Sequence, residues 1–456
     1  MGVTSAHSIT HCRRRWRQGN PPEPALLTRK LFGLLGLIIL AAVALYGWSW
    51  RPALAPITPP VFTAFAPQLV EKGAMLAGVG NCAACHTVKG GAPFAGGLGM
   101  ATPFGTIYSS NITPDPDTGI GRWSQAAFKR AMREGVRRDG AHLFPAFPYN
   151  HFTLVSDADL TALYAYFMTR PGIIVTPKEN TVPFPLSLRP LQAGWKLLFF
   201  DKGEYQTNAA KSVDWNRGRY LAEGLAHCAA CHTPRNQLGA EIKGSPYLGA
   251  KIEGWFAPAL TAANTAPLPW TEPELFAFLR SGATTLHGVA SGPMAAVVHE
   301  GLALAPDADI HALANYFADM NGSTQAAPQA DATLTAVMAR SASVAGQYND
   351  HGATLYLAAC ASCHSNSGGK PAPLRPELGL NSALTAADPA NLLQVVLRGV
   401  GRRDGAPGAM MPAFAAAMSD ADIAQLAAYL RRSRTALPPW SDLEASVAAA
   451  RRASRP

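Results

Sequence analysis

Six of the seven cysteines fall into three copies of one spacing, Cys-x-x-Cys-His. Two thiols three residues apart can each form a thioether with a vinyl group of one heme, and the adjoining histidine can then bind the iron from the proximal face. The spacing therefore predicts three heme c groups. The predicted attachment cysteines are Cys82, Cys85, Cys228, Cys231, Cys360 and Cys363, and the predicted proximal ligands are His86, His232 and His364.

The Cys-x-x-Cys pair has two competing interpretations. A redox-active dithiol expects a strand–helix context of the thioredoxin kind. A zinc site needs a second ligand pair at suitable spacing, which the sequence does not offer. Three copies of the full motif, each after a similar segment, favour heme attachment over both. The seventh cysteine, Cys12, stands alone and is interpreted as a free thiol.

The sixth ligand of each iron is expected in the loop before the last helix of each copy. Methionine opposite the proximal histidine raises the reduction potential and leaves no open position, which is typical of an electron carrier. Met294 lies in SGPMAAVV (291–298), and Met411 lies in MMPAF (410–414) beside the fallback Met410. Buried methionine is usually core filler, so the assignment depends on loop position. We predict Met294 and Met411 as distal ligands.

The first copy breaks this pattern, because its loop HLFPAFPYNHF (142–152) contains no methionine. Aligning its PAF with the PAF of the third copy places Phe144 at the position of Met411. His151 could bind iron through its imidazole and give a bis-histidine heme of lower potential, and it is our prediction for this ligand. Met100 and an open sixth position are the alternatives.

Other chemically capable residues receive structural interpretations. His227 is expected to face solvent, and His287 has no partner at ligand spacing. Trp123 and Trp270 are expected to pack as core aromatics against hemes or helices.

Each of the three motifs lies within a longer segment that occurs three times in the chain. Such an internal repeat indicates how the chain is divided into structural units. Aspartates at the start of a helix cap free N–H groups and complement the dipole, and leucine and aromatic residues then recur at helical spacing. The motif-bearing segments are GAMLAGVGNCAACH (73–86), GRYLAEGLAHCAACH (218–232) and GATLYLAACASCH (352–364); the later helices are 157–167, 307–317 and 420–430; the middle helices are 123–135, 270–282 and 389–399.

The repeat predicts an all-α chain of three tandem domains similar to class I cytochrome c, after one N-terminal transmembrane helix. Pro-rich or Ala/Ser/Gln-rich connectors are expected between separately folded domains. The predicted organisation is a basic tail (1–30), an anchor (31–50), three cytochrome c domains (66–175, 206–322 and 346–436) and a loosely packed tail (437–456).

The anchor is predicted from twenty uncharged residues, Leu31 to Trp50, which as a helix would span roughly 30 Å. Six basic residues against Glu23 precede it, and the positive-inside rule then places the N-terminus in the cytoplasm and the heme domains in the periplasm. A cleaved signal peptide ending near 53–55 is the alternative, although its apolar region would be shorter, about 7–15 residues.

The formal net charge of +9 owes a net +5 to residues 1–30. No concentrated basic face with nucleic-acid motifs appears in the remainder, so the charge indicates topology and not nucleic-acid binding.

The chain resembles the cytochrome c subunits of membrane-bound periplasmic dehydrogenases that oxidise alcohols, aldehydes or gluconate. The resemblance rests on the three motifs, on GTIYSSNITPDPDTGIGRWS (105–124), on GPM (292–294) and on MPAF (411–414). Members with quinoprotein or flavoprotein partners typically carry PAMPY where this chain has PAFPYNHF (145–152). That variant is more similar to the subunits that accompany molybdenum hydroxylases acting on aldehydes, nicotinate or isoquinoline.

The resemblance implies an electron-transfer subunit of the cell inner membrane that is not catalytic alone. It would take electrons from a catalytic dehydrogenase subunit, a molybdenum hydroxylase or a quinoprotein or flavoprotein, and pass them to a membrane quinone or a terminal oxidase. A heme enzyme reacting at the first site, and a solitary cytochrome linking respiratory complexes, are the alternative functions. The substrate and the order of electron flow are not predicted.

Overall fold

The computed structural model describes residues 1–2, 24–323, 327–343, 349–365, 371, 376–401 and 411–453, with side chains except at 24–29 and 327–329. Cys12 and Met410 lie outside the described residues. The chain divides into two compact units, Met1–Trp50 and Arg51–Pro456.

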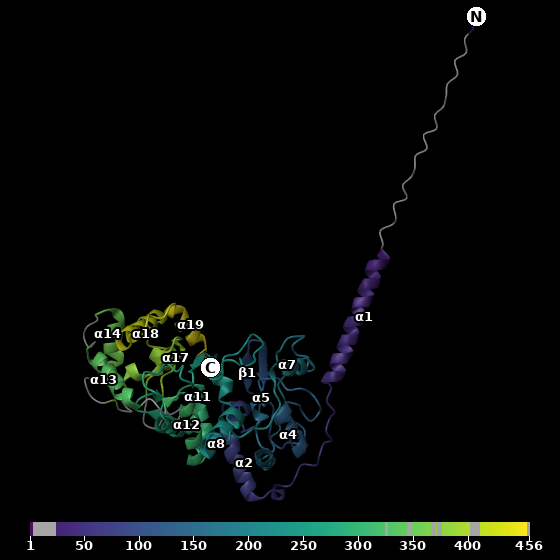
Figure 1. Ribbon diagram of the computed structural model, residues 1–456, viewed down its shortest axis with the longest axis horizontal. Coiled ribbons are helices and arrows are strands. Elements are labelled where there is room, and N and C mark those ends of the chain that lie inside the picture. Colours follow the sequence, from purple (N-terminus) through teal and green to yellow (C-terminus); the bar gives the residue numbers. More distant parts are fainter. Residues whose placement is uncertain are drawn as a thin grey trace. The chain divides into compact units, whose positions relative to one another are not determined.

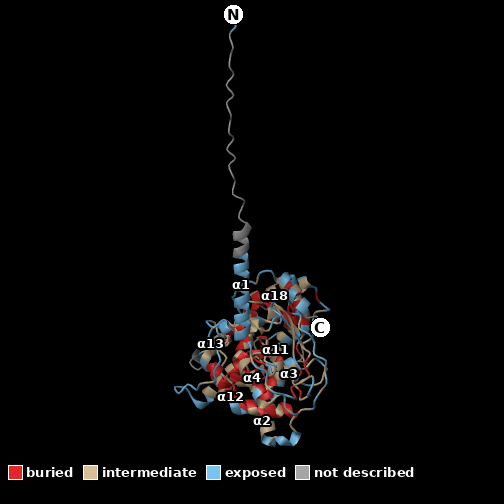
Figure 2. Ribbon diagram, turned by 90° about the vertical axis from the view of Figure 1, so that its right-hand side faces the viewer, coloured by how far each residue is buried: buried red, intermediate tan, exposed pale blue. Residues whose placement is uncertain are grey.

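The first unit contains one helix, α1 (Pro24–Ser49). Its segment Lys30–Ser49 is 20 residues long and strongly apolar, so it is long and apolar enough to cross a membrane. The described side chains of this helix are exposed almost throughout, as Figure 2 shows. A signal sequence near the N-terminus has the same properties, so length and composition alone identify this helix as a candidate span.

A close crossing of two helices occurs three times in the second unit, where Figure 1 shows the helices in sequence colours. The pairs are α2 (Pro67–Val79) with α6 (Asp157–Met168), α8 (Val213–Tyr220) with α12 (Asp307–Met320), and α14 (His351–Ala359) with α18 (Asp420–Arg434). Each first helix carries a glycine whose added Cβ would overlap a carbonyl oxygen of the second helix, so only glycine allows this approach. The overlaps are Gly73 with Ala162 (2.1 Å), Gly218 with Ala312 (1.9 Å) and Gly352 with Gln425 (2.4 Å).

The later helices begin where their aspartates predict. The Ser156 side chain accepts a hydrogen bond from the Asp159 backbone N–H at 3.2 Å, which caps α6. Ser419 does the same for Asp422, whose carboxylate in turn accepts the Ser419 N–H at 3.0 Å and completes a capping box on α18. Local capping therefore fixes the start of these helices.

The three middle helices end alike. They are α4 (Gln125–Glu134), α10 (Glu272–Ser281) and α17 (Ala390–Arg398), and each is followed by a glycine at positive φ. A short antiparallel pairing comes next in each case: Val136 with His142, β5 (Ala283–Thr284) with β6 (Gly288–Val289), and Val400 with Met411. This pairing starts the loop in which the sixth ligands are predicted.

Two hairpins depart from the all-α prediction. β1 (Gly99–Thr102) pairs with β2 (Gly105–Tyr108), and β3 (Ala250–Ile252) pairs with β4 (Trp255–Ala257). They follow the first and second motifs. Their strands have only three or four residues, too few for a recognisable alternation of apolar and polar residues.

Short elements complete the fold, and several of them carry motif residues. The remaining α-helices are α3 (Cys82–His86), α5 (Tyr149–Phe152), α7 (Leu191–Phe199), α9 (Ala229–His232), α11 (Pro293–Ala296), α13 (Ala327–Ser343), α15 (Ala361–His364), α16 (Ser382–Thr385) and α19 (Leu443–Ala453). The short turns of helix are η1 (Phe62–Ala64), η2 (Leu221–Leu225), η3 (Val297–Gly301), η4 (Leu302–Leu304) and η6 (Leu378–Leu380).

The expectation of a loosely packed C-terminal tail is wrong. Helix α19 packs on α17 and α18, and the side chain of Val447 is fully buried. Arg451 forms an ion pair with Asp420 at 2.6 Å. The apolar positions of this tail therefore belong to a core.

Buried apolar residues form two clusters; Figure 2 colours the ribbon red at all buried residues. One cluster is continuous across the first two motif-bearing repeats, from Leu76 to Ala318. The other contains residues of the third repeat together with Val447 of α19. The first two repeats thus share a core, although separate cores were expected.

Candidate functional site

The three motif histidines are oriented in the same way. Nδ1 of His86 lies 2.7 Å from the carbonyl oxygen of Ser110, and Nδ1 of His232 lies 2.7 Å from that of Pro258. Nδ1 of His364 lies 3.4 Å from the carbonyl oxygen of Pro376. A backbone acceptor at Nδ1 fixes the tautomer with its proton on that nitrogen and presents Nε2 as the metal ligand.

The protonation of these rings suits the same role. Burial lowers the pKa of His86 and of His232, and the hydrogen bond to the backbone opposes this effect. Their imidazoles are therefore held neutral, as iron ligation requires.

Four of the motif cysteines have a strongly raised thiol pKa, while Cys85 and Cys363 are exposed. None of the six forms a disulfide. Burial raises the pKa of Cys82 and Cys228 to about 12, and that of Cys231 and Cys360 to about 11. A redox dithiol needs a lowered thiol pKa, so the electrostatics oppose that interpretation. No cluster of three or more His, Cys, Asp or Glu side chains suited to a metal ion occurs among the described residues.

One cavity of about 990 Å³ touches all three motifs. Its wall includes Cys85 of the first motif, Cys231 and His232 of the second, and Cys363 and His364 of the third. The lining is mostly apolar, and its volume lies at the upper end of the roughly 300–1,000 Å³ typical of ligand sites. Such a space fits large apolar macrocycles attached at its wall.

Both methionines predicted as sixth ligands line this cavity. Met294 lies in α11 just after Gly292, whose φ of 57° turns the chain into the helix. Met411 is fixed by two backbone hydrogen bonds with Val400, at 2.7 and 2.9 Å. In the structure Met294 and His232 therefore line the same cavity, and Met411 and His364 line it as well.

His287 is a further residue of the cavity wall that could contact a polar group of a ligand. Its side chain is only 2% exposed, and it stacks on Trp270 with the ring centroids 3.8 Å apart. Among the described residues neither ring nitrogen makes a hydrogen bond, although Nε2 lies 3.8 Å from a carboxylate oxygen of Glu274, and both His287 and Trp270 line the cavity. Burial lowers the pKa of His287 to about 4. A heme carries carboxylates that could satisfy a buried donor of this kind, and no spacing in the sequence indicated this residue.

The structure does not present His151 as a free ligand. Nδ1 of His151 lies 2.8 Å from the carbonyl oxygen of Glu223, and Nε2 lies 2.8 Å from the carboxylate of Glu241. The ring is buried, and it is absent from the wall of the cavity. Both nitrogens are therefore engaged by protein oxygens, and the assignment of His151 to iron would require this arrangement to change.

The other candidates at the first motif are placed as follows. Met100 lies in β1 and lines the cavity together with Cys85. The Leu143 N–H bonds to the Gly135 carbonyl as the Ala290 N–H bonds to that of Gly282. By this register Phe147 takes the position of Met294 in the second repeat. Phe147 packs against Phe152 with the ring centroids 5.2 Å apart.

The expectation that His227 faces solvent is wrong. It is half-buried, and its Nε2 lies 3.3 Å from the carbonyl oxygen of Gly80. Burial lowers the pKa of His227 to about 4, and the neighbouring His151 acts in the same direction. His227 therefore packs between the first and second motifs.

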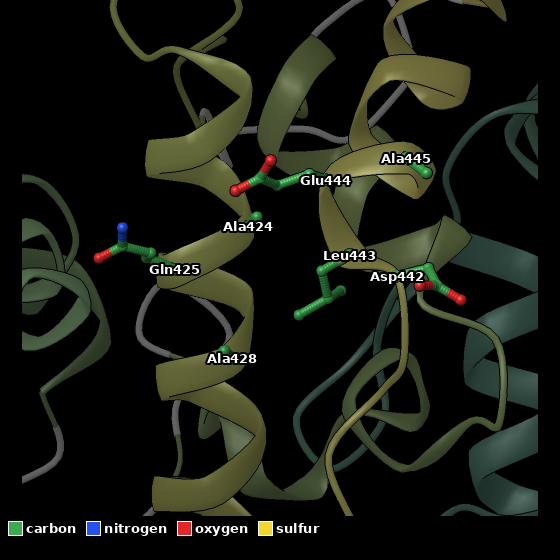
Figure 3. A pocket seen from close by; sticks show the side chains of 7 residues that line it. All are labelled: Ala424, Gln425, Ala428, Asp442, Leu443, Glu444 and Ala445. Carbon is green, nitrogen blue, oxygen red and sulfur yellow. The ribbon is translucent and has the colours of Figure 1, made fainter.

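A second hollow, of about 540 Å³, lies between α18 and the start of α19 (Figure 3). Ala424 and Ala428 face Leu443 and Glu444 across it, while the Gln425 side chain points to the other side of α18. No histidine, cysteine or methionine lines it, so it offers no ligand for heme iron.

Comparison with known proteins identifies a family. The cytochrome c family model matches residues 70–171 and 350–434. The chain is 44% identical over 442 residues to one of the subunits of nicotinate dehydrogenase from Pseudomonas putida, and the match covers 94% of this chain and 36% of that protein. It is 41% identical over 385 residues to the gluconate 2-dehydrogenase cytochrome c subunit of Pantoea cypripedii, covering 80% and 85%. It is 37% identical over 396 residues to the fructose dehydrogenase cytochrome subunit of Gluconobacter japonicus, covering 82% and 81%.

The relatives differ in length. The chain spans about a third of the nicotinate dehydrogenase protein, but more than four fifths of the other two. The first is therefore a larger protein in which a region similar to this chain is joined to further sequence.

Proposed function

The chain belongs to the family of dehydrogenase cytochrome c subunits, and on that premise we propose that it carries electrons through three covalent hemes. Members of this family are electron-transfer subunits and not the catalytic ones. A c-type heme, when bound, supplies a reversible one-electron carrier. The protein's part is to fix ligands, burial and spacing.

The repeated geometry of the motif histidines is the observation that carries the proposal of three hemes. Three Cys-x-x-Cys-His segments present a histidine with a backbone acceptor at Nδ1, and each follows a helix whose glycine meets a later helix. The family model matches the first and third of these regions. The second repeats the same contacts, so we assign it the same role.

For two of the hemes we propose histidine–methionine ligation, with His232 and Met294 at the second and His364 and Met411 at the third. Their common place on one cavity wall supports this assignment. At the first heme, His86 is the proximal ligand. There we propose that His151 joins the first and second repeats through Glu241 and does not bind iron, since both of its nitrogens are engaged.

We propose that electrons pass between the hemes within this unit. The cavity reaches residues of all three motifs, and His227, beside the second motif, contacts Gly80, which precedes the first. These contacts hold the three sites near one another.

The proposed partner is a catalytic dehydrogenase subunit of the molybdenum hydroxylase type, with a quinoprotein or flavoprotein as the alternative. PAFPYNHF in place of PAMPY supports the first choice, as does the similarity to the nicotinate dehydrogenase protein. Electrons would leave to a membrane quinone or a terminal oxidase. We further propose that α1 is an inner-membrane anchor with a cytoplasmic N-terminus and periplasmic heme domains, which its length and the preceding basic residues support.

The deciding experiment purifies the chain with its catalytic partner in mild detergent and measures heme c per polypeptide by the pyridine hemochrome spectrum. We expect three hemes, complete reduction on addition of the partner's substrate, and no stoichiometric carbon monoxide binding at the second and third hemes. Fewer than three hemes per chain, or hemes that substrate does not reduce, would contradict the proposal.

A further inference from the structure

Helix α7 (Leu191–Phe199), in the connector after the first repeat, has its polar and apolar faces reversed. Lys196 points into the protein with 9% of its surface exposed, whereas Leu197 and Leu198 are 72% and 63% exposed. Gly194, three and four residues before the two leucines, has an open side as well. A helix on a water-exposed surface normally buries its leucines and exposes its lysine. This arrangement indicates that the outer face of α7 contacts something other than water.

The exposed apolar surface extends beyond the helix. Phe184 is 79% exposed, and Leu186 and Leu188 are 41% and 46% exposed. Together with the two leucines of α7 they make five large apolar side chains within residues 184–198, which we name the apolar strap. Several large apolar side chains exposed within one short segment indicate a site of contact with another phase or molecule.

The strap is held in this orientation by polar contacts on its inner side. Lys196 donates to the carbonyl oxygens of Glu134 and Gly135, at 2.5 and 2.8 Å, where α4 ends. Its Nζ also lies 3.0 Å from Nδ1 of His142. Arg189 donates to the carbonyl oxygen of His142 at 3.2 Å. A rotation that buried the leucines would break these bonds, so their exposure is built into the fold.

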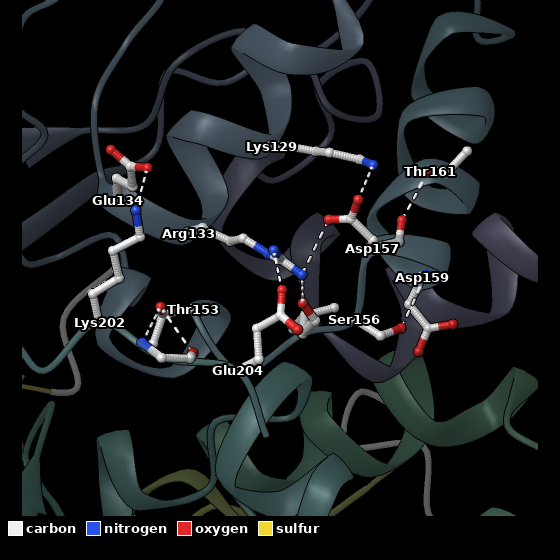
Figure 4. A network of polar contacts seen from close by, with 12 residues as sticks. Lys129, Arg133, Glu134, Thr153, Ser156, Asp157, Asp159, Thr161, Lys202 and Glu204 are labelled. Atoms are coloured by element: carbon white, nitrogen blue, oxygen red, sulfur yellow. Dashed lines mark hydrogen bonds and ion pairs between the residues drawn. The ribbon is translucent and has the colours of Figure 1, made fainter. Parts of the chain in front are cut away.

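Ion pairs fix the chain that follows the strap, as Figure 4 shows. Lys202 pairs with Glu134 at 2.7 Å, and Arg133 pairs with Glu204 at 2.6 Å. Both bonds run from the connector to α4 of the first repeat. The strap is therefore fastened at its C-terminal end to the same helix that Lys196 caps.

The residues directly after the candidate span attach to the same place. Leu54 donates its N–H to the carbonyl oxygen of Arg138 at 2.8 Å. Arg130 donates to the carbonyl oxygen of Pro52 at 2.7 Å. Gly140 packs so closely on the carbonyl oxygen of Arg51 that an added Cβ would lie 2.1 Å from it. The chain thus begins its second unit on segment 130–142, which also holds the strap.

The charge of this segment complements a bilayer surface. Residues 130–142 contain four arginines against Glu134 and Asp139. Basic residues beside an apolar face are attracted to anionic lipid headgroups at a membrane surface.

We propose that the apolar strap is an interfacial membrane contact, in which Phe184 and the leucines enter the boundary between lipid headgroups and acyl chains. The proposal rests on α1 being a membrane anchor, because covalent continuity through Arg51 is what keeps segment 130–142 at the bilayer. The strap would hold the first repeat against the membrane surface, where a lipid-soluble quinone is reached.

Labelling of the full-length holoprotein in bilayer nanodiscs tests this contact. A single cysteine is introduced by Leu197→Cys in a Cys12→Ser background and carries an environment-sensitive fluorophore. Leu357→Cys is the matched control, because Leu357 is an exposed leucine of similar exposure (61%) in helix α14 of the third repeat. Each label is compared with its own unquenched signal, which cancels quenching by heme.

We expect nitroxide-bearing lipids to quench the label at position 197 several-fold more than the label at 357, with the reverse order for a water-soluble quencher. Equal behaviour at both positions would overturn the proposal, as would protection at 197 that appears only when the catalytic subunit is added. A third variant, Leu40→Cys, reports on the anchor. Lipid quenching at 40 without quenching at 197 rejects the strap alone, whereas no lipid quenching at 40 rejects the anchor, and with it the proposal.

Discussion

Replacing Gly218 by alanine should separate the two helices that cross beside the second motif. The new Cβ would lie 1.9 Å from the carbonyl oxygen of Ala312, 2.5 Å from its carbonyl carbon and 2.9 Å from Cβ of Tyr316. Backbone atoms cannot rotate away, so α8 and α12 would have to move apart by about 1.5 Å before the contact reached the 3.4 Å of ordinary packing. Overpacking of this kind costs about 1–3 kcal/mol.

The gain in helix propensity offsets part of this cost. Alanine in place of a helical glycine stabilises by roughly 0.5–1 kcal/mol, which leaves a net loss of at most about 2.5 kcal/mol and of about 1 kcal/mol in the middle of the range. A loss of about 1 kcal/mol corresponds to a roughly 5-fold increase in local opening. Hydrogen exchange measured by mass spectrometry reports it directly, because peptides covering α8 and α12 can be compared with peptides from α14 and α18 of the same molecule.

Gly194→Ala is the matched control, since nothing lies within 4 Å of the Cβ that it would add. It should slow exchange slightly or leave it unchanged, while Gly218→Ala should speed exchange in α8 and α12 and leave α14 and α18 as they were. If the two variants exchanged alike, the close approach of these helices would not be a source of stability, and the role we give to the repeated glycine would be refuted.

Three further predictions concern ligands and acidity. Met411→Ala should lower the reduction potential of one heme by a few tenths of a volt, within the roughly 0.8 V range that axial ligands control. It should also allow carbon monoxide to bind while all hemes stay attached. Spectroelectrochemistry measures the potential, and heme staining checks the attachment. His151→Gln should leave the electron paramagnetic resonance signal of every heme unchanged, and the loss of one low-spin signal would reinstate His151 as a ligand. Hydrogen bonds from His351 and Ser419 hold the pKa of Asp422 at about 2 instead of 3.8, so the contribution of this cap to the stability of α18 should be complete above pH 3.8 and disappear as the pH falls through about 2. In Asp422→Asn, circular dichroism should show that this part of the acid transition is gone.

Local signals predicted much of the fold. The helix expected at 157–167 is α6 (Asp157–Met168), and the one expected at 420–430 begins at the same residue as α18 (Asp420–Arg434). Serine and aspartate specify these starts within one turn of chain. The hairpins were missed because strands of three or four residues carry no periodicity. The packing of α19 was missed because the tail segment alone does not show that α17 and α18 together form the surface that buries Val447.

The candidate site, too, was predicted from the sequence only in part. A Cys-x-x-Cys-His motif indicates heme attachment from five residues alone. The structure adds the orientation of each motif histidine ring. Met294 and Met411 were predicted from their positions in the loops, and both line the cavity. The ring of His151, by contrast, is engaged by Glu223 and Glu241, which lie 72 and 90 residues further along the chain. No local pattern encodes contacts at such separations, so the sequence could not indicate that both ring nitrogens of His151 contact protein oxygens.

The hairpin that follows the second motif connects the second and third repeats. The Phe256 N–H donates to Oδ1 of Asn391 at 2.8 Å, and Nδ2 of Asn391 donates back to the carbonyl oxygen of Phe256 at 2.7 Å. Lys251 of the same hairpin pairs with Asp388 at 2.7 Å. The Asn391 side chain thus replaces one rung of a strand ladder, which ties α17 to the hairpin.

This connection bears on electron transfer because carriers that exchange electrons must keep a fixed separation. The first and second repeats obtain theirs from a shared apolar core. The third has a separate core, so its distance from the second depends on polar contacts such as the Phe256–Asn391 pair. Trp255, in the same hairpin, lines the cavity that the motifs share. Loosening the hairpin should therefore slow transfer between the second and third hemes without changing either potential, whereas loss of a ligand changes a potential first.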